Sequence, residues 1–395
     1  MIKKRLKLFI DKNMKYNFDQ LSDRRNSNSI KWDVKDNELP MWIADMDFMV
    51  FPKIQEALIE AVNKGAYGYS YPTKEFFLAY QEWWQKRHHL LIDTQEMVFV
   101  SGVVSALDSL VRLLTNVNDS VMILSPSYNC FFSVIKNNNR SLVTSDIIYQ
   151  NDDFVIDYQD VEKKIIEKNV RLFIFCNPHN PTGKVWSKEE IEKIVRICDK
   201  HQVYFISDEI HCDIVDPGYE YVPTLSVYEK AIVCLSPSKV FNLAGLHSAV
   251  VVIKDEELRN KAQEAFYHDD VGEPNYFMES ATKAAYLYGD DFVDQLNDYL
   301  YQNKRYVTEY INENIPKLKV VSKNGTYLMW IDISAYNIPS ERFVKELREE
   351  TGLFLAEGIH YGDNGDSFIR MNVATSLANV KDAMNRLEKY LKDKE

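Results

Sequence analysis

A series of short, uninterrupted apolar runs constrains the fold of this chain more than any other feature. The runs are MVFVS at 97–101, the start of SVMILSPSYNCFF at 120–132, VRLFIFC at 170–176, VYFIS at 203–207, AIVCL at 231–235 and SAVVVI at 248–253. Strands that are apolar throughout are buried on both faces, and helical patterns separate several of these runs. The sequence therefore predicts an α/β fold with a mostly parallel sheet covered by helices on both faces.

The helical patterns carry recognisable start and stop signals. Pro52 opens PKIQEALIEAVNKG and Gly65 ends it, in keeping with the preference for proline at the first turn and glycine after the last. Ser187 is followed three residues later by Glu190, which predicts a capping box at the start of SKEEIEKIVRICDKH. In GVVSALDSLVRLL the apolar residues repeat on one helical face behind Gly102.

Length and charge limit the partners and the location. The chain has 395 residues and a formal net charge of −12, which argues against nucleic acid or an anionic membrane as the main partner because both select a basic face. The opening residues 1–13 have no apolar run long enough for a signal peptide. Five widely spaced cysteines resemble reduced core thiols. We expect a cytoplasmic protein that acts on a small molecule.

The chain is expected to form two domains. We place an N-terminal extension at 1–13, a large domain at 50–288 and a small α+β domain at 289–395, to which residues 14–49 contribute. The small domain begins with a long helical pattern, which could bridge the two parts. Its strands are expected at LKVVS, TYLMWIDIS and FIRMN, between the helical segments SERFVKELREETG and LANVKDAMNRLEKYLKD.

Polar residues gather where the predicted strands end. Asn177 follows VRLFIFC, Asp208 follows VYFIS, and Ser236, Ser238 and Lys239 follow AIVCL. The turn at glycine 102 precedes a helix N-terminus, whose free amides suit a phosphate. Each feature alone has an ordinary interpretation as a turn or a cap, and Lys239 alone as a lysine that reaches solvent. Together they lie at the sheet edge where ligands bind in such folds.

Pyridoxal 5'-phosphate meets all of these side-chain requirements. Its aldehyde forms a Schiff base with a lysine, its ring nitrogen pairs with a carboxylate, its phenolic oxygen accepts a hydrogen bond from an amide, and its phosphate needs a cradle of donors. Asp208 beside the ring nitrogen would keep it protonated, so that the ring withdraws electrons from a carbanion. The sequence therefore indicates a pyridoxal-phosphate enzyme.

From about Met14 onward the sequence resembles the fold-type I aminotransferase superfamily, class I/II. It looks most like the cystathionine β-lyase branch, the C–S lyases of the MalY and PatB type. The motifs that carry the resemblance, in order, are ADMDF at 44–48, YGYS at 67–70, NPHNPTG at 177–183, DEIH at 208–211, SPSKVFNLAGL at 236–246 and FIRMN at 368–372. As an ordered set they are highly specific.

The resemblance implies a role for each cofactor-binding residue. Lys239 would form the Schiff base, Asp208 would pair with the pyridine nitrogen, Asn177 would meet the phenolic oxygen, and Tyr128 would stack on the ring. His211 is also expected at the cofactor. The phosphate would be held by the amides of Val103 and Val104 and by the hydroxyls of Ser236 and Ser238.

The resemblance also implies a substrate site and a dimer. Arg370 would bind the substrate α-carboxylate, for which its planar fork is suited, and Ala44 is also expected to bind the substrate. Tyr69, in the YGYS loop, would reach the cofactor phosphate of the neighbouring subunit. Two sites that share such a loop imply a homodimer.

Two departures from the commonest aminotransferase pattern bear on the reaction. Position 247 is His247 where many relatives have an arginine, and His211 stands where a tyrosine is common. DEIH with ADMDF favours the lyase branch, so the resemblance implies α,β-elimination on L-cystathionine or a related L-cysteine S-conjugate, releasing a thiol, pyruvate and ammonia. The alternative is a class I/II aminotransferase acting on an L-amino acid.

Other interpretations remain open at this stage. Ser236 and Lys239 form an SxxK pair like that of penicillin-binding serine acylases, but their companion SDN and KTG motifs do not occur in the sequence. His211 and Cys212, with two acidic residues before them, lack a second group at ligand spacing, so no metal is predicted. A regulatory domain that borrows the fold is a third possibility. Asp45 and Asp47 alternate with apolar residues, as in an edge strand with a wet face.

Overall fold

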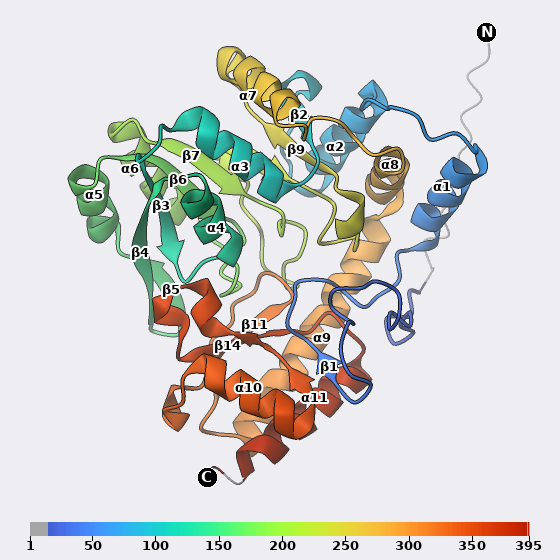
Figure 1. The fold of residues 1–395 in the computed structure, drawn as a ribbon, viewed down its shortest axis with the longest axis vertical. Helices are drawn as coiled ribbons and strands as arrows, with labels where there is room; N and C mark the ends of the chain where they lie inside the picture. Colours follow the sequence, from blue (N-terminus) through green and yellow to red (C-terminus); the bar gives the residue numbers. More distant parts are fainter. Residues whose placement is uncertain (1–14, 393, 395) are drawn as a thin grey trace.

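The computed structural model describes residues 15–392 and residue 394. The N-terminal extension expected at 1–13 lies outside the described residues. Within the described part, no helix combines the length and the apolar character needed to cross a membrane. The chain forms an upper part built on a large sheet and a lower part built on a small one (Figure 1).

The large sheet has eight strands, and most of them are parallel, as predicted. In spatial order they are β2 (Met97–Val100), β9 (Ala249–Val252), β8 (Ile232–Leu235), β7 (Tyr204–Asp208), β6 (Val170–Cys176), β3 (Ser120–Ser125), β4 (Ser141–Gln150) and β5 (Asp153–Ile156). Strands β9 and β5 run in the opposite direction to the other six strands of this sheet. The apolar run at 248–253 is thus a buried strand, but its direction could not be read from its composition.

Helices cover both faces of this sheet. Along β6, Leu172 and Ile174 belong to one hydrophobic cluster and Phe173 and Phe175 to the other, as the two-residue repeat of a strand requires. Helices α3 (Val103–Leu114), α4 (Asn129–Asn137) and α7 (Glu256–His268) pack in the first cluster. The second contains α1 (Pro52–Asn63), α2 (Lys74–Arg87), α5 (Tyr158–Glu167), α6 (Lys188–Lys200) and α8 (Met278–Tyr288).

The predicted start signals of two helices, α1 and α6, are confirmed. Pro52 is the first residue of α1. Ser187 caps α6, since its side chain accepts a hydrogen bond from the Glu190 amide at 3.2 Å while the Glu190 carboxylate accepts one from the Ser187 amide at 2.8 Å.

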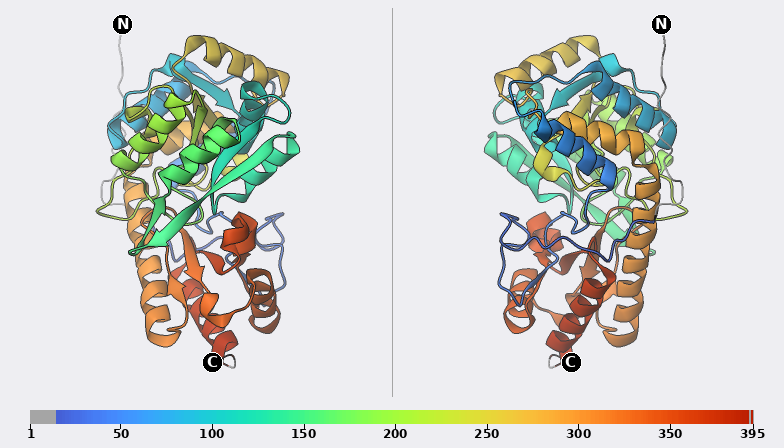
Figure 2. Two further views of the ribbon diagram at one scale, coloured as in Figure 1. Left: turned by 90° about the vertical axis from the view of Figure 1, so that its left-hand side faces the viewer. Right: turned by 90° about the vertical axis from the view of Figure 1, so that its right-hand side faces the viewer.

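Helix α9 (Asp290–Asn314) connects the two parts of the molecule (Figure 2). Its first half contributes Phe292 and Leu296 to the core of the large sheet, and its second half contributes Val307 and Ile311 to a separate core. That second core belongs to a four-stranded sheet of β10 (Lys319–Val320), β11 (Leu328–Asp332), β14 (Phe368–Asn372) and β13 (Ala356–Glu357), with α10 (Ser340–Thr351) and α11 (Leu377–Lys392). The division into a large domain at 50–288 and a small domain at 289–395 stays a proposal, and the first half of α9 packs with the large sheet although it lies after residue 288.

Residues 15–51 run across the small sheet and then rise to the large one (Figures 1 and 2). Leu39 and Pro40 form strand β1, which pairs in parallel with β12 (Leu353–Phe354). The edge strand with a wet face suggested for ADMDF is wrong. The segment is irregular apart from a single bridge at Phe48, and the Asp47 side chain is 1% exposed because Lys31 pairs with it.

Candidate active site

A cavity of about 240 Å³ lies at the carboxyl ends of the parallel strands, where the sequence placed the ligand site. The loops after β2, β3, β6, β7 and β8 contribute residues to it, and so does the N-terminal segment. Its lining contains Ala44, Ser101, Gly102, Val103, Val104, Ser105, Tyr128, Cys176, Asn180, Asp208, Ile210, His211, Ser236, Ser238, Lys239, Ala244, His247 and Ser248.

Lys239 is the one lysine in this lining. It follows β8 and is half-buried, and its Nζ donates a hydrogen bond to the Ala44 carbonyl oxygen at 2.8 Å. Burial and the nearby charge of Arg370 lower the pKa of Lys239, although Asp45 and Asp208 oppose this. A lysine with a lowered pKa holds a larger fraction of neutral, nucleophilic amine.

Asp208 ends β7 and is buried. Its Oδ1 accepts a hydrogen bond from the Ile210 amide at 3.2 Å. Burial raises the pKa of Asp208 to about 7, against the opposing effects of that amide and of Lys239. A buried carboxylate at a cavity wall gains most from a cationic ligand group, because the pair restores the interaction lost on leaving water.

His211 lies beside Asp208 in the cavity wall and is buried. Its Nδ1 has no hydrogen-bond partner among the described residues. Burial, followed by the charges of Lys239 and Arg370, lowers the pKa of His211 well below the ordinary value, so the ring is neutral. An unpaired buried ring nitrogen costs free energy unless a ligand satisfies it.

A cradle for an anion lies at the other end of the cavity. Gly102 has φ +116°, and α3 begins at the next residue, so the first amides of the helix are free of helical partners. Ser236 Oγ lies 2.8 Å from Ser238 Oγ and 2.7 Å from the Ser248 carbonyl oxygen. His247 Nδ1 lies 4.0 Å from the position that a Cβ on Gly102 would take. Helix amides, two hydroxyls and an imidazole suit a phosphate.

Tyr128 and Arg370 lie on the remaining sides. Tyr128 is the residue before α4 and lines the cavity. Arg370, in β14, is buried next to the cavity, and its Nη1 donates to Asn180 Oδ1 at 3.0 Å while its Nη2 donates to the Trp42 carbonyl oxygen at 2.8 Å. Its guanidinium stands over the Tyr361 ring, 4.6 Å from the centroid. The guanidinium is therefore fixed in one orientation.

Nine of the predicted site residues line the cavity and three do not: Arg370, which reaches it only through its hydrogen bond to Asn180, Asn177 and Tyr69. Asn177 does not line the cavity, and its Nδ2 donates to the Val222 carbonyl oxygen at 2.9 Å. Asn180, which the sequence interpretation did not select, lines the cavity instead. Both belong to NPHNPTG, so the motif located the amide but not which of its two asparagines reaches the cavity. Tyr69 is fully exposed and lies outside the lining.

The arrangement does not support a serine acylase. In such a site the lysine amine contacts the serine hydroxyl. Here Lys239 Nζ bonds to Ala44, and Ser236 Oγ bonds within its own loop and to Ser248.

The cysteine next to His211 faces away from the cavity, toward a different cluster. Potential ligand atoms of His88, Cys212 and Asp213 lie within 4.8 Å of one another. The Asp213 carboxylate already accepts hydrogen bonds from Trp83 Nε1 at 3.0 Å and pairs with His88 Nε2 at 2.9 Å. The buried Asp213 carboxylate is therefore hydrogen-bonded by Trp83 and His88.

Known proteins resemble this chain over almost its entire length. Cystathionine beta-lyase PatB of Bacillus subtilis is 33% identical, covering 95% of this chain and 100% of PatB. The crystal structure of cystalysin from Treponema denticola, which contains a pyridoxal 5'-phosphate cofactor, superposes with a TM-score of 0.93 at 32% identity, covering 97% of this chain and 100% of cystalysin. The pyridoxal-phosphate-bound C–S lyase of Staphylococcus hominis superposes with a TM-score of 0.91 at 32% identity, covering 96% and 99%.

The family model for aminotransferase class I and II matches residues 39–387. This range includes the cavity with Lys239 and Asp208 and extends beyond β14. The chain therefore belongs to the class I and II aminotransferase family.

Proposed function

We propose that this protein is a pyridoxal-phosphate-dependent C–S β-lyase that cleaves L-cystathionine or a related L-cysteine S-conjugate to a thiol, pyruvate and ammonia. The observation that carries the proposal is the placement of Lys239 and Asp208 in one cavity whose far end is a phosphate cradle. The names of PatB and of the S. hominis C–S lyase support the reaction class.

The residues of the cavity fit the cofactor group by group. The Lys239 amine is available for its aldehyde. Asp208 offers a buried carboxyl group, whose ionised form a cationic partner such as a pyridinium would stabilise. The Gly102 turn and the amides of Val103 and Val104 suit its phosphate. The unsatisfied Nδ1 of His211 offers a further contact. When bound, pyridoxal phosphate supplies an electron-withdrawing ring that stabilises a carbanion at the substrate α-carbon.

Side chains of the protein bind the substrate and transfer its proton. Arg370 binds the substrate α-carboxylate with its fixed guanidinium, and Asn180 orients that guanidinium. Lys239, which has a lowered pKa, accepts the α-proton as a general base. Tyr128, which lines the cavity, would pack on one side of the cofactor ring. Departure of a thiolate from the β-carbon requires no keto-acid acceptor, whereas transamination does.

We further propose a cytoplasmic homodimer in which Tyr69 of one subunit reaches the phosphate cradle of the other. Tyr67, Tyr69 and Tyr71 are exposed by 52%, 101% and 77% in a loop that one chain alone leaves uncovered. Exposed aromatic residues in such number favour a protein interface. The five cysteines are unpaired, in keeping with a reducing compartment.

The test is an absorbance spectrum of the purified protein, followed by titration with L-cystathionine while pyruvate and free thiol are assayed. Yellow protein that releases pyruvate and thiol without any added keto acid supports the lyase. Strict dependence on 2-oxoglutarate would identify an aminotransferase instead. Lys239→Ala is expected to lose both the yellow colour and turnover, and a variant that kept full lyase activity would exclude Lys239 as the catalytic lysine.

A further inference from the structure

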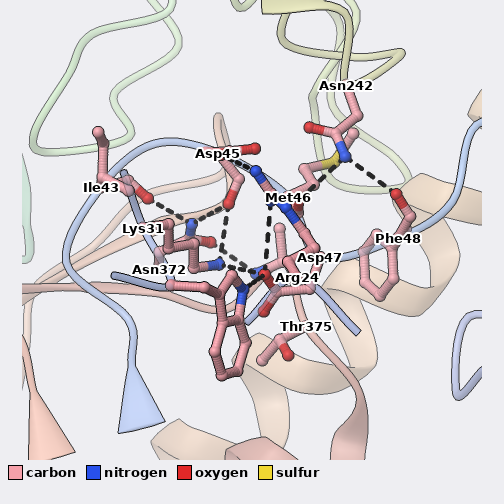
Figure 3. A network of polar contacts seen from close by, with 12 residues as sticks. Arg24, Lys31, Ile43, Asp45, Met46, Asp47, Phe48, Asn242, Asn372 and Thr375 are labelled. Atoms are coloured by element: carbon pink, nitrogen blue, oxygen red, sulfur yellow. Dashed lines mark hydrogen bonds and ion pairs between the residues drawn. The ribbon is translucent and has the colours of Figure 1, made fainter. Parts of the chain in front are cut away.

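Residues 43–48, an irregular segment over the cavity, are held by side chains from three separate parts of the chain (Figure 3). Five of the six backbone carbonyl oxygens accept hydrogen bonds from buried or partly buried side chains, and the Ile43 oxygen also accepts one from the Asp45 amide. The donors are Asn372 for Ile43, Lys239 for Ala44, Lys31 and Asn372 for Asp45, Arg24 and Asn242 for Met46, and Asn242 for Phe48. Because so many of its carbonyl oxygens are hydrogen-bonded, this irregular backbone has little freedom to move.

The Asn372 side chain is hydrogen-bonded to the backbone of this segment on both sides of Ala44. Its Nδ2 donates to the Ile43 carbonyl oxygen at 2.7 Å and to the Asp45 carbonyl oxygen at 2.8 Å. Asn372 is buried at the end of β14, two residues after Arg370. The same small-domain strand therefore carries the guanidinium beside the cavity and the amide that orients Ala44.

Asn242 attaches the segment to the loop of the lysine. It lies three residues after Lys239, and its Nδ2 donates to the carbonyl oxygens of Met46 and Phe48, each at 2.9 Å. Its φ of +57° lies in the left-handed region, which is unfavourable for residues with a side chain, although least so for asparagine. Asn242 thus ties the two partners of the Lys239–Ala44 bond to each other.

A buried ion pair supports the segment from below. Lys31 Nζ lies 2.9 Å from Asp47 Oδ1, and their side chains are 0% and 1% exposed. Lys31 also donates to the Asp45 carbonyl oxygen at 2.9 Å, and Trp32 Nε1 donates to Asp47 Oδ1 at 2.7 Å. A buried ion pair is a poor source of stability compared with apolar residues of the same size, and positional specificity is one reason for such a pair.

We propose that the Lys31–Asp47 pair, together with Asn372 and Asn242, is a positioning device for Lys239. It fixes the Ala44 carbonyl oxygen where the lysine amine donates to it. With one N–H directed at Ala44, rotation about the terminal bond of the side chain is restricted, and the amine lone pair keeps a defined direction in the cavity. The inference rests on the proposed role of Lys239 as general base. Lys31 and Asp47 line no part of the cavity, so they act only through the segment.

The test compares two double variants. Lys31→Met/Asp47→Asn removes the ion pair without leaving a lone buried charge, which would risk unfolding. Lys304→Met/Asp216→Asn is the matched control, because Lys304 Nζ and Asp216 Oδ1 lie 2.6 Å apart with both side chains 8% exposed, in a pair outside the cavity lining. A third variant, Asn372→Leu, removes the two hydrogen bonds on either side of Ala44 without changing a charge.

The readouts are kcat and KM per bound cofactor, the absorption spectrum of the loaded protein, and the isotope effect with substrate deuterated at the α-carbon. If the lysine amine is displaced by a fraction of an ångström, the rate of proton transfer to it is expected to fall roughly tenfold. We expect Lys31→Met/Asp47→Asn and Asn372→Leu to lower kcat by that factor, to change KM little, to increase the isotope effect and to alter the spectrum. The control is expected to keep all four quantities, whatever its change in thermal stability.

Two outcomes would overturn the inference. One is wild-type kcat and isotope effect in both Lys31→Met/Asp47→Asn and Asn372→Leu. The other is an equal change in the control pair, since that would make the effect one of general stability. If the wild type formed no pyruvate but catalysed transamination, the proposed function would fail, whereas the same comparison of isotope effects would still test the positioning, because both reactions begin with loss of the α-proton.

Discussion

Arg370 and Asn180 connect the small sheet to the large one beside the cavity. Arg370 Nη1, from β14 of the small sheet, donates to Asn180 Oδ1, from the loop after β6 of the large sheet, at 3.0 Å. Both residues are buried. The Arg370 Nε has no hydrogen-bond partner among the described residues, so the guanidinium retains a donor. A carboxylate that entered beside Asn180 would complete its hydrogen bonding.

Arg370→Lys is expected to weaken substrate binding although it keeps the charge. A lysine offers no planar fork, and it cannot contact Asn180 and Trp42 together as Arg370 does. We expect KM for L-cystathionine to rise roughly 10-fold to 100-fold, the equivalent of about 1.5–3 kcal/mol for a hydrogen bond to a charged group. Steady-state kinetics measure this. Arg348→Lys is the control, since Arg348 bonds to Glu38 and stands over the Phe354 ring, neither of which lines the cavity, whereas Arg370 bonds to Asn180, which does. An equal rise in KM there would contradict the assignment.

Asn180→Ala is expected to impair the enzyme more than Asn177→Ala. Asn180 lines the cavity and orients Arg370, whereas the side chain of Asn177 bonds to the Val222 carbonyl oxygen. Loss of the Asn180 amide should lower kcat/KM roughly tenfold or more, in line with about 1.5 kcal/mol or more for a hydrogen bond to a charged group. Parallel measurement of kcat/KM and of thermal stability separates the two. A larger kinetic loss in Asn177→Ala would instead support the original sequence assignment.

Asp208→Asn should change how the cofactor-free protein responds to pH. Burial raises the pKa of Asp208 from 3.8 to about 7, so folding disfavours the ionised form. The stabilising contribution of the protonated group is present below pH 4 and is lost as the pH rises through about 7, with a limit of roughly 4 kcal/mol. Urea unfolding of cofactor-free samples should find the variant more stable than the wild type at pH 8 and equal to it near pH 4. Identical pH profiles would show that Asp208 has an ordinary pKa.

The same substitution is expected to weaken the hold on the cofactor. Asparagine presents no negative charge to a pyridinium, so equilibrium dialysis should find lower affinity of Asp208→Asn for pyridoxal phosphate. Glu209→Gln is a nearby comparison, because Glu209 is also buried but bonds to Ser207, Thr224 and Tyr221 away from the cavity lining.

Tyr69→Phe and Lys239→Ala are expected to complement each other when mixed. Each variant alone should have little activity. If Tyr69 serves the neighbouring subunit, a hybrid dimer contains one site with an intact Lys239 from one chain and an intact Tyr69 from the other. Co-expression should therefore restore lyase activity. Absence of any recovery in a verified hybrid would mean that Tyr69 serves its own subunit or none, although Tyr69 is fully exposed in the single chain.

Much of the fold follows from local patterns in the sequence. The apolar runs became buried strands because a continuous run leaves no wet face, and Ser187 caps α6 because the bonds of a capping box form within four residues. Lys239, Asp208 and Ser236 could be assigned to one site because each follows a parallel strand directly, and parallel strands end at a common edge.

Contacts between segments far apart in the chain could not be predicted from these local patterns. Asp45 and Asp47 alternate with apolar residues as in an exposed strand, yet Lys31 and Asn372 hold that segment beside Lys239. Likewise NPHNPTG offers two asparagines, and only the path of the loop decides that Asn180 reaches the cavity and Arg370.

The sequence by itself therefore determined the layered α/β fold, the edge of the sheet that bears the site, and the lysine and carboxylate at its centre, because these depend on strand periodicity and on residues adjacent to strand ends. The tertiary structure alone decided that the Ala44 carbonyl oxygen receives the Lys239 amine and that Asn372 of β14 bonds to the backbone on both sides of Ala44. Those contacts join residues far apart in the chain, and their geometry depends on how the two cores pack around α9.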